Sequence, residues 1–309
     1  MICIIMSTYN GEKYLEKQLD SIFMQNISCN ELCLYVRDDG SIDNTIELLK
    51  SYKNINNVDI IVDAGENKGA ADSFFDAIKK CPDAEYYAFC DQDDVWHQNK
   101  LKTAVEELGG VHGPALWCSN YDVVDSELNV LTPKAIQQAR LNDRQALFFN
   151  NIPGCVMVFN QALMSELRKI EVSHIRMHDI MAINVALICG KVIFNSHSFI
   201  KYRQHQNNVI GYGHKKKNLV KWINEKLCVL IHKEKYSYSE YAKEILRLFG
   251  DIMCDEQLKD YSIIAGIDKS LLNRVRLLRK SYMKERLGRT SISIRTKILL
   301  GLFRRNNDA

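Results

Sequence analysis

Three carboxylates stand within four positions of one another, directly after an apolar run. The run Tyr86–Cys90 is followed by Asp91, Gln92, Asp93 and Asp94, so a predicted strand delivers acidic groups to the edge of a sheet. Carboxylates this close repel one another, and a hard divalent cation with oxygen ligands is the simplest way to neutralise them. The pattern therefore predicts a metal site at the end of this strand. The alternative is a solvated acidic turn that caps the following helix.

Another acidic position follows a second predicted strand. Asp39 comes shortly after the apolar run Cys33–Val36. A carboxylate there can accept a hydrogen bond from the imide N–H of uracil or thymine, which cytosine does not donate at that position. Tyr9 is suited to stack on such a base, and Gly40 and Gly69 permit tight turns or a close approach of the backbone. The alternative for Asp39 is a local turn or a cap of the next helix.

The elements that must position these residues alternate along the first third of the chain. Short apolar runs, which predict buried strands, each precede a stretch with apolar residues at helical spacing. The predicted strands are Ile2–Met6, Cys33–Val36, Ile60–Val62 and Tyr86–Cys90. Four strand and helix units predict a mainly parallel sheet with helices on both faces, and ligands then bind beyond the carboxyl ends of the strands. No GxGxxG turn and no Walker A motif occurs, which argues against a dinucleotide fold and a P-loop.

The stretch from 110 to 213 predicts further strands and one more candidate carboxylate. Asp179 stands near the first turn of a predicted helix, where the helix dipole stabilises an anion; the alternative is an ordinary capping Asp. His178 either orients this carboxylate or packs. Asn151–Gly154 predicts a loop that either borders the site or merely connects. Strands are expected at 115–120, 122–125, 155–159, 191–195 and 199–202, with helices at 144–149 and 183–188.

Four segments together resemble the signature series of family 2 glycosyltransferases. They are Ser7–Asn10, Asp38–Asp43, Glu66–Gly69 and Cys90–Trp96, in the family's order and spacing. The likeness is greatest to bacterial rhamnosyltransferase-like enzymes that build capsule, O-antigen and related polysaccharides. It covers residues 1–213 and implies an α/β GT-A type nucleotide-diphospho-sugar transferase fold. Within it, residues 1–109 would form the nucleotide-sugar-binding half and residues 110–213 the acceptor-side half.

The same resemblance implies a role for the donor-side residues. The base would bind to Asp39 and lie against Tyr9, and Asp91 would lie beside the sugar or its ribose. The signature segments also assign Thr8, Asn67 and Gly69 to donor binding.

Catalytic and metal roles follow from the resemblance as well. Asp93 would coordinate Mg²⁺ or Mn²⁺ on the diphosphate, and Asp179 would be the catalytic base. Arg203 and His205 would meet the diphosphate, with His205 as a further metal ligand. The alternative for this last segment is a plain surface loop.

The implied function is an inverting, metal-dependent sugar transfer. The sugar, rhamnose or another hexose, would pass from a UDP- or dTDP-sugar to a saccharide acceptor, lipid-linked, during synthesis of a cell-surface polysaccharide. Two rivals are a non-catalytic saccharide- or nucleotide-binding module on the same fold and a nucleotidyltransferase. Joint presence of Asp39, Asp91, Asp93 and Asp179 disfavours the first, and the lack of a glycine-rich basic loop after the first strand disfavours the second.

Charge divides the chain into two regions. Residues 214–309 carry 22 Lys and Arg against 11 Asp and Glu, a net charge of +11, whereas residues 1–213 carry −8. The basic region is predicted to form amphipathic helices at 219–230, 241–249, 271–278 and 298–303. No nucleic-acid-binding motif accompanies the charge. This second domain is therefore expected either to dock on an anionic membrane surface or to pack on the catalytic domain.

The sequence also predicts where the protein resides. No window reaches the about 20 apolar residues of a membrane span. The ten cysteines lie mostly in apolar runs, without a CxxC pair. We expect a cytoplasmic protein with reduced cysteines, at the inner face of the cell membrane if the basic helices dock there.

Overall fold

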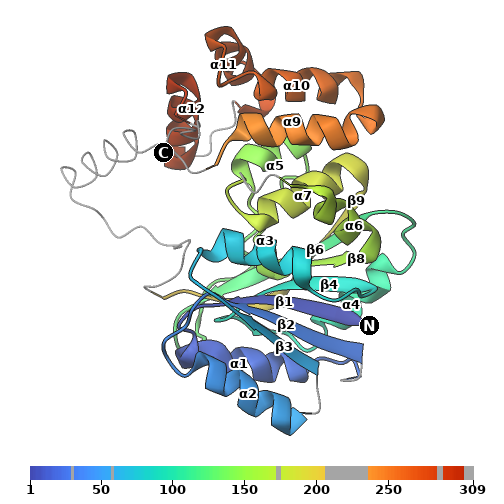
Figure 1. Cartoon of the computed structure of the whole chain (residues 1–309), viewed down its shortest axis with the longest axis vertical. Helices are drawn as coiled ribbons and strands as arrows, with labels where there is room; N and C mark the ends of the chain where they lie inside the picture. The colour runs from blue at the N-terminus through green and yellow to red at the C-terminus, as the bar shows by residue number, and fades with distance from the viewer. Residues whose placement is uncertain (29–30, 57–58, 172–174, 206–235, 284–287, 303–309) are drawn as a thin grey trace, which may run out of the picture.

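A nine-stranded sheet organises the protein (Figure 1). Its strands run in the order β3, β2, β1, β4, β8, β6, β9 and β5, and β7 pairs with β6. The structure is a computed structural model that describes residues 1–28, 31–56, 59–171, 175–205, 236–283 and 288–302.

The first four strands are parallel, as predicted. They are β1 (Ile2–Thr8), β2 (Leu32–Asp38), β3 (Asp59–Ala64) and β4 (Tyr86–Asp91). Every residue of β2 is buried, because helices cover both faces of the sheet. In the register, Thr8 lies beside Asp38 and Ser7 beside Asp91. The acidic ends of β2 and β4 therefore flank the end of β1 at one edge of the sheet.

Helices lie on both sides of the sheet (Figure 1). One face is covered by α1 (Glu12–Phe23) and α2 (Thr45–Asn56), and the other by α3 (Ala70–Lys80), α6 (Gln161–Lys169) and α7 (His178–Cys189). A further helix, α4 (Lys100–Leu108), packs against β6 and β8. This arrangement confirms the predicted α/β fold.

The second half of the sheet is mixed, and two of its strands, β6 and β9, are longer than predicted. It contains β5 (Val95–Trp96), β6 (Ala115–Val124), β7 (Val130–Thr132), β8 (Met157–Asn160) and β9 (Lys191–Arg203). The expected strand pairs at 115–125 and 191–202 are each one strand, because the pairing of β6 with β9 continues past two register shifts. The strand expected from 155 begins at 157, since Gly154–Val156 forms a 3-10 turn. The helix α5 (Asp143–Phe149) agrees with the prediction.

The C-terminal helices are α9 (Tyr238–Phe249), α10 (Asp255–Ala265), α11 (Leu271–Leu278) and α12 (Gly288–Leu300). The first two contact α7, whereas α11 packs on α10 and α12 on α11. Buried Asn184 of α7 accepts a hydrogen bond from the hydroxyl of Tyr241 (2.9 Å) and donates one to the hydroxyl of Tyr261 (2.7 Å). The helices predicted at 241–249 and 271–278 are confirmed; α10 was not predicted. The helix predicted at 219–230 and the domain boundary at 213/214 lie outside the described residues.

Two expectations from composition concern the described residues. None of their helices has the length and apolar character needed to cross a bilayer. Their cysteines are free thiols, and most of them are buried, as expected.

Candidate active site

The acidic segment at the end of β4 forms a turn, and the carboxylate of Asp94 in it is completely buried. Carboxylate oxygens of Asp91 and Asp94 and the sulfur of Cys155 lie within 4.8 Å of one another. Burial, followed by the charges of Asp93 and Asp179, raises the pKa of Asp91 to about 7. Burial also raises the pKa of Asp94, with added repulsion from Asp93 and Asp91. Burial and mutual repulsion therefore disfavour full ionisation of these carboxyl groups unless a cation is bound.

A buried cation lies under this segment. Lys100, at the start of α4, is fully buried, and its ammonium donates to the carbonyl oxygen of Cys155 at 2.7 Å. The same Nζ lies 3.2 Å from the centroid of the Trp96 ring. Burial lowers the pKa of Lys100 to about 7, against the opposing effect of nearby groups that include Asp94 and Asp91. Lys100 thus connects the acidic segment to the loop before β8.

Arg203, the last residue of β9, and His205 beyond it contact the acidic segment. His205 Nε2 lies 2.7 Å from an oxygen of Asp93. Arg203 is fully buried: its Nε donates to the carbonyl oxygen of Asp93 (2.8 Å) and its backbone N–H to Asp94 (3.1 Å). The guanidinium lies 4.6 Å from the ring centroid of Tyr14, which also packs against His205. Arg203 therefore holds the acidic segment through its backbone.

Asp38, the last residue of β2, and Asp39, which follows it, have different hydrogen-bond partners. Asp38 accepts from the hydroxyl of Thr8 (2.7 Å) and from the backbone of Gly40 and Ser41, so Asp38 makes the local turn. Asp39 instead accepts from the backbone N–H groups of Lys68 and Gly69, both at 2.8 Å. The local turn that we considered for Asp39 is made by Asp38 instead. Asp39 connects the loop after β2 to the loop after β3.

The loop after β3 supplies the other predicted donor residues. Gly69 has φ +90°, a conformation that favours glycine, and it precedes α3. Asn67 is exposed in this loop. A Cβ on Gly40 would lie 3.4 Å from the backbone nitrogen of Asn67, so this loop returns beside the turn after β2.

Gln92 links the ends of β1 and β4, and the sequence assigned it no role. Its side-chain oxygen accepts from the backbone N–H of Tyr9 (2.9 Å), and its amide donates to the carbonyl oxygen of Tyr9 (3.1 Å). A Cβ on Gly11 would lie 2.3 Å from the same oxygen, so a larger residue there would displace the Gln92 side chain from these two hydrogen bonds. The Tyr9 backbone is fixed while its side chain remains 47% exposed. The position of Gln92 between Asp91 and Asp93 was the sequence feature that could have indicated a role for it.

Asp179 lies in the first turn of α7 and is almost fully buried. The cap of α7 is Met177, so Asp179 is not the capping residue that we considered. One of its oxygens accepts from the backbone N–H of Ile180 (2.7 Å) and the other from the side-chain amide of Asn150 (3.3 Å). Burial raises its pKa to about 6. Asp179 is thus ionised at neutral pH, yet close enough in pKa to accept a proton readily.

His178 packs and does not hydrogen-bond to Asp179 in the described structure. Its ring stacks on Phe74 (centroids 3.7 Å apart) and meets Phe89 edge-on (4.7 Å). Burial lowers its pKa to about 3, so the imidazole is neutral. A Cβ on Gly154 would lie 2.4 Å from His178 Nε2, which requires glycine there. The loop 151–154 therefore rests on the base of α7, next to Asp179.

The side chains predicted to bind metal suit a hard divalent cation. Asp91, Asp93 and His205 offer oxygen and imidazole ligands, which suit Mg²⁺ or Mn²⁺. Burial, with added repulsion from Asp93 and Asp179, raises the pKa of Asp91, and a cation bound beside this group would favour its carboxylate form. The thiol of Cys155 has a raised pKa through burial and stays protonated, so the cluster of Asp91, Asp94 and Cys155 is a poor site for a soft metal.

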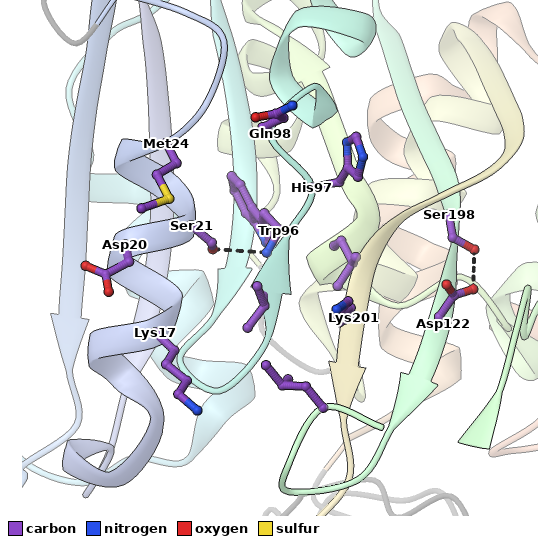
Figure 2. A pocket seen from close by; sticks show the side chains of 13 residues that line it. Lys17, Asp20, Ser21, Met24, Trp96, His97, Gln98, Asp122, Ser198 and Lys201 are labelled. Atoms are coloured by element: carbon purple, nitrogen blue, oxygen red, sulfur yellow. Dashed lines mark hydrogen bonds between the residues drawn. The ribbon is translucent and has the colours of Figure 1, made fainter. Parts of the chain in front are cut away.

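A separate cavity of about 480 Å³ lies between α1, β5 and β9 (Figure 2). It contains none of the residues predicted to bind donor, metal or acceptor. Its wall includes Trp96, whose backbone N–H donates to Ser21 at 3.0 Å, and the hydrogen-bonded pair Ser198 and Asp122 (2.6 Å). The cavity is therefore distinct from the carboxylate site.

Solved structures with the same architecture define the class. Residues 1–349 of S. aureus TarS, crystallised with UDP-GlcNAc, match with a TM-score of 0.56 at 15% identity, over 97% of this chain and 90% of that one. A Pyrobaculum calidifontis mannosyltransferase, in complex with GDP-Man and Mn²⁺, matches with a TM-score of 0.51 at 16% identity, over 97% and 85% of the two chains. The fold is that of GT-A glycosyltransferases.

The sequence places the chain within that class. Residues 3–166 match the model of glycosyl transferase family 2, and the chain belongs to this family. It is 27% identical over 224 residues to the dTDP-rhamnosyl transferase RfbG of Shigella flexneri, covering 67% of this chain and 73% of that protein. It is 24% identical over 224 residues to the Escherichia coli glucosyltransferase WfgD, covering 68% and 85%. The predicted family and its rhamnosyltransferase-like character are confirmed. A shorter match, 31% identical over 34% of this chain and 41% of the relative, is to a putative teichuronic acid biosynthesis glycosyltransferase, TuaG, of Bacillus subtilis.

Proposed function

We propose that this glycosyltransferase is inverting and metal-dependent, and that it uses a UDP- or dTDP-sugar and a lipid-linked saccharide acceptor. The names of its relatives support the donor and acceptor classes: RfbG is a dTDP-rhamnosyl transferase, and WfgD transfers glucose from UDP-Glc to a diphosphoundecaprenol-linked sugar. The transferred sugar would be rhamnose or another hexose. The product would enter a capsule, an O-antigen or another surface polysaccharide, assembled at the cytoplasmic face of the membrane.

One observation carries this proposal: a buried, ionisable carboxylate faces the acidic segment. After burial, which is the largest cause, the negative charges on Asp93 and Asp179 raise the pKa of Asp91, so the three groups share one electrostatic environment. A base and a cation-binding carboxylate in one site are what a sugar transfer from a diphosphate requires.

In the proposed reaction, an acceptor hydroxyl oxygen attacks the anomeric carbon of the donor sugar from the face opposite the diphosphate. A new C–O bond forms, the bond from the anomeric carbon to the diphosphate oxygen breaks, and its electron pair leaves with the diphosphate. Asp179 takes the hydroxyl proton. Attack from the opposite face inverts the anomeric configuration. A Mg²⁺ or Mn²⁺ ion on Asp93, with Asp91 and His205, would supply positive charge for the leaving diphosphate.

The donor would be held beside this centre by the loops after β1, β2 and β3. The exposed ring of Tyr9 offers a stacking surface for the base. Asp39 has two hydrogen bonds to loop backbone, and its oxygens retain further lone pairs for the imide N–H. Thr8 and Gly69 would fix these loops, and exposed Asn67 would contact the donor directly. Arg203 would act on the diphosphate through the segment that it holds.

The test is a donor screen with the purified protein and Mn²⁺. Release of UDP or dTDP from each nucleotide sugar is measured with and without a short lipid-linked acceptor, and the anomeric configuration of the product is read by NMR. We expect one donor to be turned over, with acceptor-dependent release and inversion. Retention of configuration, or turnover no faster than that of the Asp179→Asn variant for every donor, would contradict the proposal.

A further inference from the structure

Four leucines are exposed at one junction of the outer helices. Leu271 and Leu272 open α11, and Leu299 and Leu300 end α12; their exposed fractions are 62%, 57%, 44% and 56%. We call these four residues the leucine patch. Single exposed leucines are normal on a protein surface, but a group of four is not explained by packing.

Arg274 fixes the geometry of this junction. One turn after Leu271, it donates to the carbonyl oxygens of Ile267 (2.7 Å) and Asp268 (3.1 Å) and also to that of Leu299 (3.3 Å). The chain leaves α12 through Gly301, at φ +69°, against the same guanidinium. The two leucine pairs are therefore held next to each other by the fold.

The two segments that carry the leucine patch are mostly basic, although one of their cations, Lys280, pairs with buried Asp260 of α10 (2.5 Å). Among residues 268–283 and 293–302, seven Lys and Arg stand against a single acidic residue, Asp268. Three of these cations, Lys269, Arg276 and Arg279, are exposed. Apolar side chains surrounded by cations are the combination that binds the interface of an anionic bilayer.

We propose that the leucine patch and its surrounding cations dock the protein on an anionic lipid bilayer. A second copy of this chain would be a poor occupant, because two-fold contact would set these cations against one another. In Figure 1, β1 runs from the labelled amino terminus toward the left of the view, the side on which α12 also lies. The need for docking rests on the proposed lipid-linked acceptor.

The experiment is co-sedimentation of the full chain with vesicles of phosphatidylcholine and phosphatidylglycerol, and with vesicles of phosphatidylcholine alone. We expect binding only to the anionic vesicles and release at high salt. Lys269→Gln, Arg276→Gln and Arg279→Gln together should weaken binding roughly a hundredfold, since each cation contributes about fivefold. Serine at all four leucine positions should weaken it by a similar or larger factor.

Matched controls separate the patch from total charge and hydrophobicity. Lys50→Gln with Lys53→Gln removes exposed cations from α2, and Val130→Ser with Leu131→Ser removes exposed apolar groups from β7. Both controls should bind vesicles as the parent protein does. Equal weakening by controls and patch variants would overturn the proposal, and so would unchanged binding of the leucine variant. Sedimentation velocity provides a further check: dissociation of a dimer in the leucine variant would reassign the patch to self-association.

The same variants distinguish this proposal from the function on which it rests. Transfer to a short soluble acceptor should survive in the patch variants while vesicle binding is lost. If patch-dependent vesicle binding is found but no nucleotide sugar is turned over by the parent protein, docking stands and the proposed function fails. If turnover is found without vesicle binding, the function stands and docking fails.

Discussion

The acidic edge of the sheet and the basic outer helices use charge in opposite ways. At the sheet edge, Asp94 and Asp179 are buried and Asp91 is partly buried. Burial raises the pKa of each, and neighbouring carboxylates add to the shift at Asp91 and Asp94. On α11, cations such as Arg276 and Arg279 are exposed, where water and salt weaken any single interaction. Buried charges therefore matter one at a time, whereas exposed charges matter through their sum. Single substitutions should have large effects in the first region and small ones in the second.

The largest effect is expected from Asp93→Ala. Loss of this carboxylate removes the proposed cation ligand and the partner of His205, so kcat should fall by about 10³ or more. Initial rates at saturating Mn²⁺ measure it, and excess chelator should abolish the parent activity. Asp251→Ala, an exposed carboxylate after α9, is the control and should retain the parent rate. Full activity in chelator would contradict the metal role.

Replacement of the proposed base should stabilise the fold. The pKa of Asp179 rises from 3.8 to about 6, so between these values the folded protein binds more protons than the unfolded chain, and unfolding free energy falls as pH rises. Asp179→Asn should therefore raise the unfolding free energy at pH 7 by up to about 3 kcal/mol and have little effect below about pH 4. Urea titrations of the metal-free protein at the two pH values measure this. A destabilised variant at pH 7 would show that the carboxylate is structural.

Lys100 tests whether buried cations matter individually. Burial lowers the pKa of Lys100 from 10.5 to about 7, so between these values the unfolded chain binds more protons than the folded protein and the unfolding free energy rises with pH. Lys100→Met removes this titration, at the cost of the hydrogen bond to the carbonyl oxygen of Cys155, and should reduce the rise in unfolding free energy between pH 7 and pH 10 by about 3 kcal/mol. The control is Lys102→Met, an exposed lysine on the same helix, which should change it by less than about 0.5 kcal/mol. Equal effects of the two substitutions in urea titrations would remove the distinction between buried and exposed cations.

The pH dependence of catalysis should follow Asp179. Because only the carboxylate accepts the proton, kcat/KM should fall about tenfold per pH unit below pH 6. The profile is measured between about pH 5 and pH 8 at saturating metal. If kcat/KM does not change down to pH 5, the ionisation of Asp179 does not control the rate.

The sequence predicted the parallel half of the fold well, because apolar periodicity is strong where a sheet is covered on both faces. It missed the continuity of β9, since exposed and partly buried residues at 195–198 read as a break. It also missed Lys100: a lysine at a helix start reads as solvated, and only tertiary packing places it under Trp96. The adjacent Asp38 and Asp39 could not be separated from spacing alone, because their different tasks depend on where the loop after β3 returns.

The catalytic residues themselves came from a family resemblance rather than from periodicity. Asp179 lies more than 80 positions beyond Asp93, and only the packing of α7 against the sheet brings its charge to the acidic segment. The roles of the donor residues remain predictions that the screen above addresses.

The most direct test compares chemistry and donor binding in the Asp179→Asn variant. Single-turnover transfer is measured by rapid quench, and donor affinity by calorimetry with Mn²⁺ present. We predict that the transfer rate falls by about 10² to 10⁴ while the donor Kd changes by no more than a few fold, since the amide keeps the shape of the side chain but cannot take the acceptor proton. A transfer rate close to that of the parent, or a collapse of donor binding, would contradict the assignment of Asp179 as the base.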